Sequence, residues 1–305
     1  MSGVRTFEVD DWTLERIVAA KAGRTVSMCI PCHDEVATIG SLVGAIRSVL
    51  VDRHVVVDEL IVLDDRSTDD TAVVAARAGA TVVPIGDIHE RYGVGHGKGN
   101  ALWATLAAST GDFVVWCDGD VTSFQPSWVA HLLAPLLDDD TVHLVKARYE
   151  RPTHAGGGGR TTELVARPLL SLYFSELTGL HQPLSGEFAG RRAALEQIPF
   201  IQGWGVEIAM LAELAHRHGA SAIAQVDLGV RMHRHRTLHE LSVQAAEVTA
   251  ALLSRVKGAP PLPPEPSLTR ADGTVLPLNL TERPPLATVR SPTAADRDVR
   301  GTPQT

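Results

Sequence analysis

Short, continuously apolar runs alternate with helix-like stretches through the first half of this 305-residue chain. The apolar runs lie at 26–30, 59–63, 81–85 and 113–117, and the helical patterns between them lie at 39–50, 69–78 and 99–108. Strands that are buried on both faces have this composition, and helices between them make the crossover connections of a parallel sheet. The pattern predicts an α/β fold with an open, doubly wound, mostly parallel sheet. Its ligand should lie at the carboxyl ends of the strands.

The second half of the chain has a looser order. Helices are expected at 127–137, 162–177, 206–218 and 238–256, and strands at 142–148 and 222–233. A glycine-rich connection, 154–160, precedes the second of these helices. Ten of the 18 prolines follow Lys257. We therefore expect 258–305 to lie over the surface as a tail or arm without regular core structure.

Charge and composition narrow the classes of partner. The net charge of −8 disfavours a nucleic-acid partner, because phosphate backbones would be repelled at long range. Residues 1–11 lack the apolar segment of a secretion signal, and no run approaches the ~20 apolar residues of a membrane-spanning helix. We expect a cytoplasmic protein without stable membrane insertion. The pair Cys29 and Cys32 has redox or zinc spacing, but no second such pair exists, which favours packing thiols.

Two carboxylates follow the apolar run 113–117 directly, in the sequence Asp118-Gly119-Asp120. Carboxylates two residues apart at the mouth of a buried strand can face Mg²⁺ or Mn²⁺, whose other ligands are water and phosphate oxygens. The sequence 138–140 matches the same spacing, but it lies at a helix end where the carboxylates are expected to be solvated. The strand context favours Asp118 and Asp120 as the functional pair.

Two polar turns follow the first two apolar runs, IPCHDE at 30–35 and LDDRSTD at 63–69. Either turn could simply cap a helix, but both bring acidic and hydroxyl groups to the strand edge that carries Asp118. Such groups accept the N–H and O–H donors of a base and a ribose. Together with WCDGD, in this order, they resemble the nucleotide-sugar signature of GT-A fold glycosyltransferases. That resemblance implies that the turns hold uridine and that Asp118-Gly119-Asp120, the DxD motif, holds a metal and the diphosphate.

Four further segments carry candidate chemistry. The loop 93–100 is neither a Walker motif nor GxGxxG, but its glycines allow close backbone approach and Lys98 offers a charge for phosphate. Segment 231–236 alternates arginine and histidine, which suits phosphate and one metal-binding histidine. Segment 160–162 places an arginine and two hydroxyls at the start of a helix, which suits an anion. Segment 203–207 places a tryptophan and a carboxylate at the start of another. The alternative interpretations are a mobile loop at 93–100, a solvated strand end at 231–236 and ordinary helix caps at 160–162 and 203–207.

The ordered set GHGKGN, CDGD, AGGGGRTTEL, GWGVEI and RMHRHR, between about residues 26 and 256, resembles actinobacterial glucosyl-3-phosphoglycerate synthases. The resemblance implies a dimeric enzyme that transfers glucose from UDP-glucose to the 2-hydroxyl of 3-phosphoglycerate with retention. It implies Mg²⁺, for which Mn²⁺ could substitute, bound by Asp120 and His233. We expect a nucleotide-sugar half at 25–122 and a half at 123–257 that binds the acceptor and completes the metal site, after a helical extension at 1–24.

The expected site residues fall into three groups. Donor contacts are expected from Pro31, Cys32, His33, Asp34, Glu35, Asp65, Ser67, Lys98, Asp118, Gly119, Trp204, Gly205, Val206, Glu207, Arg231, His233, Arg234 and Arg236. Acceptor contacts are expected from Gly159, Arg160, Thr161, Thr162 and His235, the last standing where relatives carry Asn. The catalytic group comprises Asp120, Lys98, Glu207 and Arg236.

Three alternatives remain open from the sequence. An enzyme of the same fold could use another acceptor such as a polyprenyl phosphate, although no membrane segment supports a lipid. A non-catalytic nucleotide-sugar sensor would keep the turns but could lose the metal or acceptor groups. A nucleotidyltransferase is disfavoured because no glycine-rich loop bearing arginine and lysine follows the first strand.

Overall fold

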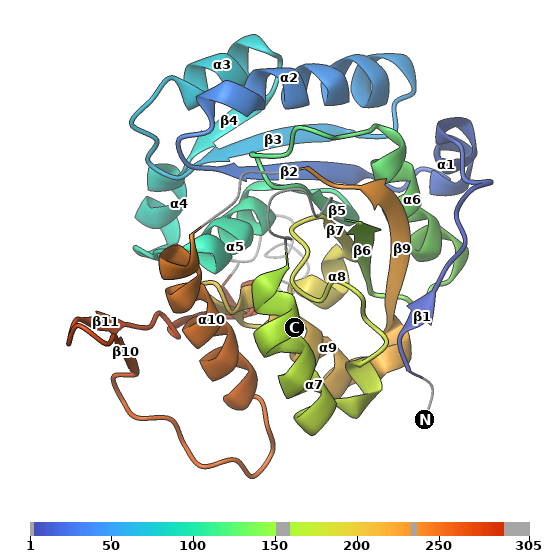
Figure 1. Cartoon of the computed structure of the whole chain (residues 1–305). Helices are drawn as coiled ribbons and strands as arrows, with labels where there is room; N and C mark the ends of the chain where they lie inside the picture. Colours follow the sequence, from blue (N-terminus) through green and yellow to red (C-terminus); the bar gives the residue numbers. More distant parts are fainter. Residues whose placement is uncertain (1–2, 151–158, 233–236, 290–305) are drawn as a thin grey trace, which may run out of the picture.

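A computed structural model describes residues 3–150, 159–232 and 237–289 of the chain. Its centre is an eight-stranded sheet of order β1-β9-β6-β7-β5-β2-β3-β4, with helices on both faces (Figure 1). All strand pairs in this sheet are parallel except those made by β7. The predicted α/β architecture with a mostly parallel sheet is therefore confirmed.

The strands of the first half divide their side chains between two cores. They are β2 (Val26–Cys32), β3 (Glu59–Asp64), β4 (Thr81–Pro84) and β5 (Phe113–Trp116). In β5, Val114 and Trp116 belong to one core and Phe113 and Val115 to the other, as the two-residue period of a strand requires. A strand packed on both faces needs apolar side chains throughout, which is why these runs are visible in the sequence.

Two layers of helices cover the sheet (Figure 1). Side chains from α1 (Leu14–Lys21), α2 (Val36–Ile46), α3 (Thr71–Arg77) and α6 (Ser127–Asp138) fill one core. The other core takes side chains from α4 (Ile85–Tyr92), α5 (Lys98–Ala108), α7 (Arg167–Tyr173), α8 (Arg192–Leu195), α9 (Val206–His218) and α10 (Leu238–Leu253). Among the described helices, none is long and apolar enough to cross a bilayer.

The second half adds β1 (Arg5–Thr6), β6 (Leu144–Glu150), β7 (Phe188–Arg191) and β9 (Ile223–Val230). Strand β7 runs antiparallel between β5 and β6 and was not predicted. It is short and contains Gly190, where an added Cβ would lie 2.9 Å from a Leu195 methyl carbon. Close backbone packing at this glycine removes the side-chain pattern by which a strand is recognised.

Several helix predictions need correction. The predicted helix 39–50 begins earlier, as α2, and continues as a π-helical stretch at Arg47–Arg53. The predicted helix 162–177 is a π-helical stretch (Thr162–Ala166), then α7, then a 3₁₀ turn (Ser175–Leu177). Helix α4 was missed because its start was assigned to the preceding strand, and α5 already begins at Lys98.

The C-terminal segment is more ordered than its proline content suggests. It forms the hairpin β10 (Ser267–Thr269) and β11 (Val275–Pro277), which lies beside α10 (Figure 1). Strand β12 (Glu282–Arg283) then pairs with β8 (Phe200–Ile201), and the short helix α11 (Leu286–Val289) follows. Arg283 and Leu286 are buried. The expectation that this segment adds nothing to the core is therefore wrong for 282–289.

Candidate active site

A cavity of about 440 Å³ opens where the carboxyl ends of β2, β3 and β5 meet. Strands β6 and β9 run parallel to these, so their carboxyl ends reach the same edge. The sequence-predicted residues that line the cavity are Pro31, Cys32, His33, Glu35, Asp65, Lys98, Asp118, Gly119, Asp120, Gly159, Arg160, Thr161, Thr162, Trp204 and Arg231. The topology thus gathers segments far apart in sequence around one opening, which is where an open α/β sheet binds its ligand.

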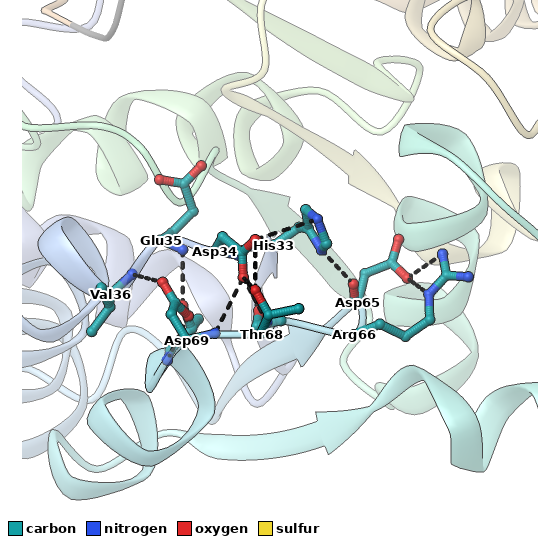
Figure 2. A network of polar contacts seen from close by, with 10 residues as sticks. His33, Asp34, Glu35, Val36, Asp65, Arg66, Thr68 and Asp69 are labelled. Carbon is teal, nitrogen blue, oxygen red and sulfur yellow. Dashed lines mark hydrogen bonds and ion pairs between the residues drawn. The ribbon is translucent and has the colours of Figure 1, made fainter.

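The two polar turns hold each other in place by hydrogen bonds (Figure 2). The ring Nδ1 of His33 lies 2.7 Å from the Asp65 carbonyl oxygen, and the Asp34 backbone N–H donates to Ser67 Oγ at 3.1 Å. The Thr68 backbone N–H donates to Asp34 Oδ1 at 2.7 Å. Asp34 and Ser67 therefore join the turns to each other and do not line the cavity.

Backbone conformation explains part of this turn chemistry. Asp34 and Arg66 occupy the left-handed region, with φ of 56° and 62°. Aspartate tolerates this region better than most residues, because its short polar side chain can bond locally. At the helix end of the turn, the Glu35 backbone N–H donates to Thr71 Oγ1 at 2.8 Å. The network leaves the Glu35 and Asp65 side chains at the cavity wall.

Lys98 lies between two carboxylates at the cavity wall. Its Nζ is 2.6 Å from Glu207 Oε1 and 3.2 Å from Asp118 Oδ1. Burial alone would lower the pKa of Lys98, but the two carboxylates outweigh it and raise the pKa. Lys98 is therefore a permanent cation whose position is fixed by residues of two other segments.

Arg231 makes a second fixed cation. It is 3% exposed, and its Nε lies 2.9 Å from both oxygens of Glu187, which is 1% exposed. Its Nη2 donates to Asp118 Oδ2 at 3.0 Å. Burial acts to lower the pKa of Arg231, but Glu187 and Asp118 outweigh this and raise it. Arg231, which directly follows β9, therefore connects Glu187, the residue before β7, to Asp118.

Asp118 and Asp120 differ in their environments. Burial acts to raise the pKa of Asp118, but Lys98 and Arg231 outweigh it and lower the pKa to about 2. Asp120 is affected in the opposite way, because burial and the like charge of Asp118 raise its pKa. Asp120 Oδ1 is buried without a hydrogen-bond partner, and the nearest guanidinium nitrogen of Arg231 is 3.7 Å away. A buried carboxylate oxygen without a partner at a cavity wall fits a divalent cation.

The second proposed metal ligand, His233, lies outside the described residues, as do Arg234, His235 and Arg236. Within the described part of the chain, no three His, Cys, Asp or Glu side chains gather as a metal site. A cation that takes one or two carboxylates and fills its shell with water and phosphate oxygens needs no such group. The residues present therefore fit Mg²⁺ or Mn²⁺ better than a structural zinc ion.

Glycines allow this crowding of charged groups. A Cβ at Gly186 would lie 2.0 Å from Asp118 Oδ2, so only glycine lets the 185–187 segment cross above that carboxylate. A Cβ at Gly119 would lie 2.7 Å from Cys32 Sγ. A side chain at either position would therefore displace Asp118 or Cys32.

A further lysine lies beneath this cluster. Lys146, on β6, is fully buried and donates to the Ser185 carbonyl oxygen at 2.6 Å. Its Nζ lies 4.4 Å from the centre of the Phe188 ring. Burial lowers the pKa of Lys146 to about 8. Lys146 thus supports the 185–187 segment from below without lining the cavity.

Residues 159–162 also line the cavity. Thr161 and Thr162 are buried at the start of the π-helical stretch, and the Glu163 N–H donates to the Gly159 carbonyl oxygen at 2.9 Å. Arg160 lies beside them in the lining. Two hydroxyl-bearing residues and an arginine in this part of the lining are residue types that suit an anionic ligand.

Trp204 is placed by a buried carboxylate of α10. Glu247 Oε2 accepts a 2.7 Å hydrogen bond from the Trp204 backbone N–H, and Oε1 accepts one from the Asn279 N–H at 2.8 Å. The neighbouring Gly203 permits this, since its Cβ would lie 2.3 Å from Glu247 Oε2. The indole ring consequently lies beside Lys98, whose Nζ is 6.0 Å from the ring centre.

Comparisons with known proteins identify the family of this chain. A family model for glycosyl transferase family 2 matches residues 27–199. The glucosyl-3-phosphoglycerate synthase of Mycolicibacterium paratuberculosis is 46% identical over 94% of this chain and 91% of its own. The chain belongs to the glucosyl-3-phosphoglycerate synthases of glycosyl transferase family 2. The corresponding Mycobacterium tuberculosis enzyme is 45% identical over 93% of this chain and 92% of its own.

Solved structures of this family superpose closely. The Mycobacterium tuberculosis synthase with Mn²⁺, UDP-glucose and phosphoglyceric acid matches with a TM-score of 0.86 at 44% identity, covering 94% of this chain and 99% of that one. Its complex with Mn²⁺, UDP and glucosyl-3-phosphoglycerate matches with a TM-score of 0.85 at 45% identity, covering 94% of this chain and 100% of that one. Another contains Mg²⁺ and UDP, with a TM-score of 0.85 at 45% identity over 94% and 99% of the two chains.

Several expected family residues lie outside the cavity lining. Gly205, Val206 and Glu207 form the start of α9. Glu207 is buried and pairs with Lys98 at 2.6 Å, whereas Gly205 packs its backbone against Ala251. Sequence reasoning also missed residues that line the cavity or support it. They are Ala101, Tyr149, Leu184, Gly186, Leu241, Gln244, Glu187 and Lys146. None of them stands out in the sequence, since Lys146 shares β6 with the charged Arg148 and Glu150, and Glu187 precedes the unpredicted strand β7.

The three cysteines are free and buried, as the packing interpretation expects. Burial raises the pKa of Cys29 to about 12 and raises that of Cys32 further. Thiols in this state stay protonated at neutral pH and are poor nucleophiles.

Proposed function

We propose that this protein transfers glucose from UDP-glucose to 3-phosphoglycerate, giving glucosyl-3-phosphoglycerate and UDP. The observation that carries the proposal is that the fixed cations Lys98 and Arg231 at Asp118 line the same cavity as Arg160, Thr161 and Thr162. The structures of relatives with donor, acceptor and product in a site of the same fold support it.

The donor lies along the edge formed by β2, β3 and α5. Glu35 and Asp65, held at the wall by the paired turns, accept hydrogen bonds from the base and ribose of uridine. The diphosphate lies against Gly97 and Lys98 at the amino end of α5, where the lysine offers positive charge. The next two N–H groups, of Gly99 and Asn100, already donate to the Gly203 and Gln202 carbonyl oxygens. Trp204, in the cavity lining, contacts the glucose.

Departure of the diphosphate is the chemical obstacle, because negative charge grows on it as the anomeric bond breaks. Lys98 is held in place before the reaction by Asp118 and Glu207, so stabilising this charge needs little rearrangement. Asp120, with His233, would hold Mg²⁺ or Mn²⁺, which when bound supplies Lewis-acid charge to the diphosphate. Arg231 is held by Glu187 and Asp118 and keeps the DxD in position.

The acceptor binds at the part of the cavity lined by residues 159–162. Arg160 and the hydroxyls of Thr161 and Thr162 bind the phosphate and carboxylate of 3-phosphoglycerate. The reaction proceeds with retention, and Glu207 acts as a positioning group, because its carboxylate is buried and engaged by Lys98 at 2.6 Å. We also assign Arg236 to catalysis and Arg234 and His235 to substrate contacts, on the family resemblance alone. A homodimer and a cytoplasmic location complete the proposal.

The test is incubation with UDP-glucose, Mg²⁺ and 3-phosphoglycerate, with UDP and glucosyl-3-phosphoglycerate both measured. We expect both products from the wild type and neither from Asp120→Asn. An α-anomeric proton coupling in the product NMR spectrum would support retention, and a β coupling would contradict it. Product from a polyprenyl phosphate but not from 3-phosphoglycerate would overturn the acceptor assignment, and UDP-glucose binding without any transfer would favour a sensor.

A further inference from the structure

Gly93, Gly95 and Gly97 make up most of the loop 93–97, and glycine restrains its own backbone little because it has no Cβ. Gly93 and Gly97 adopt φ of 83° and 95°, and the Gly95 N–H lies 3.3 Å from His89 Nε2 of α4. The loop leads directly into Lys98, the first residue of α5. Besides the pairs of Lys98 with Asp118 and Glu207, contacts to this loop therefore help to set the position of the lysine.

Arg283 of β12 fills the space behind this loop. It is 4% exposed, and its three donor nitrogens reach three neutral acceptors. Nη1 donates to the Tyr92 carbonyl oxygen at 2.9 Å, and Nη2 donates to that of Gly93 at 2.7 Å. Nε donates to Asn100 Oδ1 at 2.8 Å. One planar guanidinium therefore joins the start of the loop to the first turn of α5.

The contact is too close to be an incidental surface interaction. A Cβ at Gly95 would lie 2.1 Å from Asn100 Oδ1 and 2.6 Å from Arg283 Nη2, so the loop wraps around this pair. The guanidinium also lies 5.0 Å from the centre of the Trp103 ring. In the described ranges 3–150, 159–232 and 237–289, no carboxylate forms an ion pair with Arg283. A buried cation without a counter-charge is costly, and this one is kept by acceptors of the loop.

The same C-terminal segment holds the far side of the loop. Asn279 Nδ2 donates to the His96 carbonyl oxygen at 2.7 Å. The Gln202 side-chain oxygen accepts a 2.9 Å hydrogen bond from the His96 N–H, and the Gln202 backbone N–H donates to the Thr281 carbonyl oxygen at 2.8 Å. Both ends of the loop are thus attached to residues 183 to 191 positions later in the chain.

We propose that Arg283 is a positioning residue for the nucleotide-sugar donor, acting through the glycine-rich loop and Asn100 to place Lys98 and the amino end of α5. The proposal rests on the proposed function for the identity of the donor. Because Arg283 contacts Tyr92, Gly93 and Asn100 and does not line the cavity itself, its loss should weaken donor binding through the loop and leave acceptor binding unchanged.

The test compares Arg283→Met and Arg283→Lys with Arg192→Met. Arg192 is the control, a buried arginine that donates to the Leu106 and Gly111 carbonyl oxygens and to Ser109 near the amino end of β5, at the opposite edge of the sheet. Unlike Arg283, it also pairs with a carboxylate, that of Glu196 at 3.2 Å. For the Arg283 variants we expect the Kd of UDP-glucose with Mn²⁺ to rise about 10- to 100-fold by calorimetry, while the Michaelis constant for the acceptor stays unchanged. Arg192→Met should lower thermal stability without changing either constant.

Asn100→Ala should reproduce the effect, and the double variant with Arg283→Met should be no weaker than the stronger single variant. Additive losses, or equal losses for donor and acceptor, would overturn the proposal. Arg283→Lys keeps the charge, and its Kd for UDP-glucose tests the proposal if Arg283→Met does not fold.

Hydrogen exchange measures the order of the loop directly, without depending on the enzymatic reaction. In the Arg283 variants, amides 93–101 should exchange faster while those of β2 and β5 remain protected. Unchanged exchange at 93–101 would refute the positioning role whatever the substrate. Faster exchange with no UDP-glucose binding by the wild type would refute the proposed donor instead.

Discussion

The paired turns after β2 and β3 and the glycine-rich loop before α5 border the same cavity but are held in different ways. The turns are held by their own side chains, for example by Asp34 accepting from the Thr68 N–H at 2.7 Å. The loop is held by Arg283 and Asn279, which are brought to it by the β8–β12 pairing. Local hydrogen bonding leaves a signature in a sequence, whereas support from a distant segment does not.

The largest effect should come from the loop side. Lys98→Met removes the cation that faces the leaving diphosphate while keeping a side chain of similar length. We expect kcat to fall by ~10²–10³-fold, the cost of one preorganised contact to developing charge. Initial rates of UDP release, with circular dichroism to confirm folding, measure this. A kcat within about threefold of the wild-type value would remove Lys98 from the chemistry.

On the turn side, Asp34→Ala should act through the local network. It removes the acceptor for the Thr68 N–H and places alanine at a φ of 56°. We expect the free energy of unfolding to fall by about 2 kcal/mol. Asp34→Gly loses only the hydrogen bond and should cost about 1 kcal/mol. Urea denaturation of both variants measures the difference, and equal losses would show that backbone conformation at Asp34 is unimportant.

A third stretch of the rim, 185–187, is held from below by Lys146, and this support should depend on pH. The pKa of Lys146 is about 8 in the folded protein against 10.5 in the unfolded chain, because burial disfavours the charged form. The unfolded chain therefore binds more protons between these values, and stability should rise with pH in that window. The slope is at most about 1.4 kcal/mol per pH unit.

Urea denaturation between about pH 8 and about pH 10, for wild type and Lys146→Met, isolates this contribution. The difference in unfolding free energy, wild type minus variant, should increase with pH. A flat difference would mean that Lys146 titrates alike in the folded and unfolded states.

The smallest effect should come from Asn279→Ala, which removes one hydrogen bond to the His96 carbonyl oxygen. The backbone N–H of residue 279 still donates to Glu247. We expect about 1 kcal/mol of lost donor affinity, roughly a fivefold rise in Kd. Calorimetry with UDP-glucose measures it, with Thr274→Ala in the β10–β11 hairpin as a control from the same segment. Equal Kd values for the two variants would show that Asn279 does not hold the loop.

The strands of the first half were predictable because burial on both faces demands unbroken apolar runs. The DxD and the two turns were found because each follows such a run directly. Strand β7 was missed because Gly190 interrupts its pattern, and Glu187, which fixes Arg231, was missed with it. Arg283 lies in a proline-rich segment, where composition suggested a surface arm. Its contacts depend on tertiary packing that no local pattern records.

The most direct test is a crystal structure of this protein with UDP-glucose and Mn²⁺. We expect the diphosphate within hydrogen-bonding distance of Lys98 Nζ and the amino end of α5, with the metal on Asp120. Arg283 should still donate to the Tyr92 and Gly93 carbonyl oxygens behind the loop. A nucleotide bound elsewhere, or a diphosphate that leaves Lys98 between Asp118 and Glu207 without touching it, would contradict the proposed role of the cation cluster.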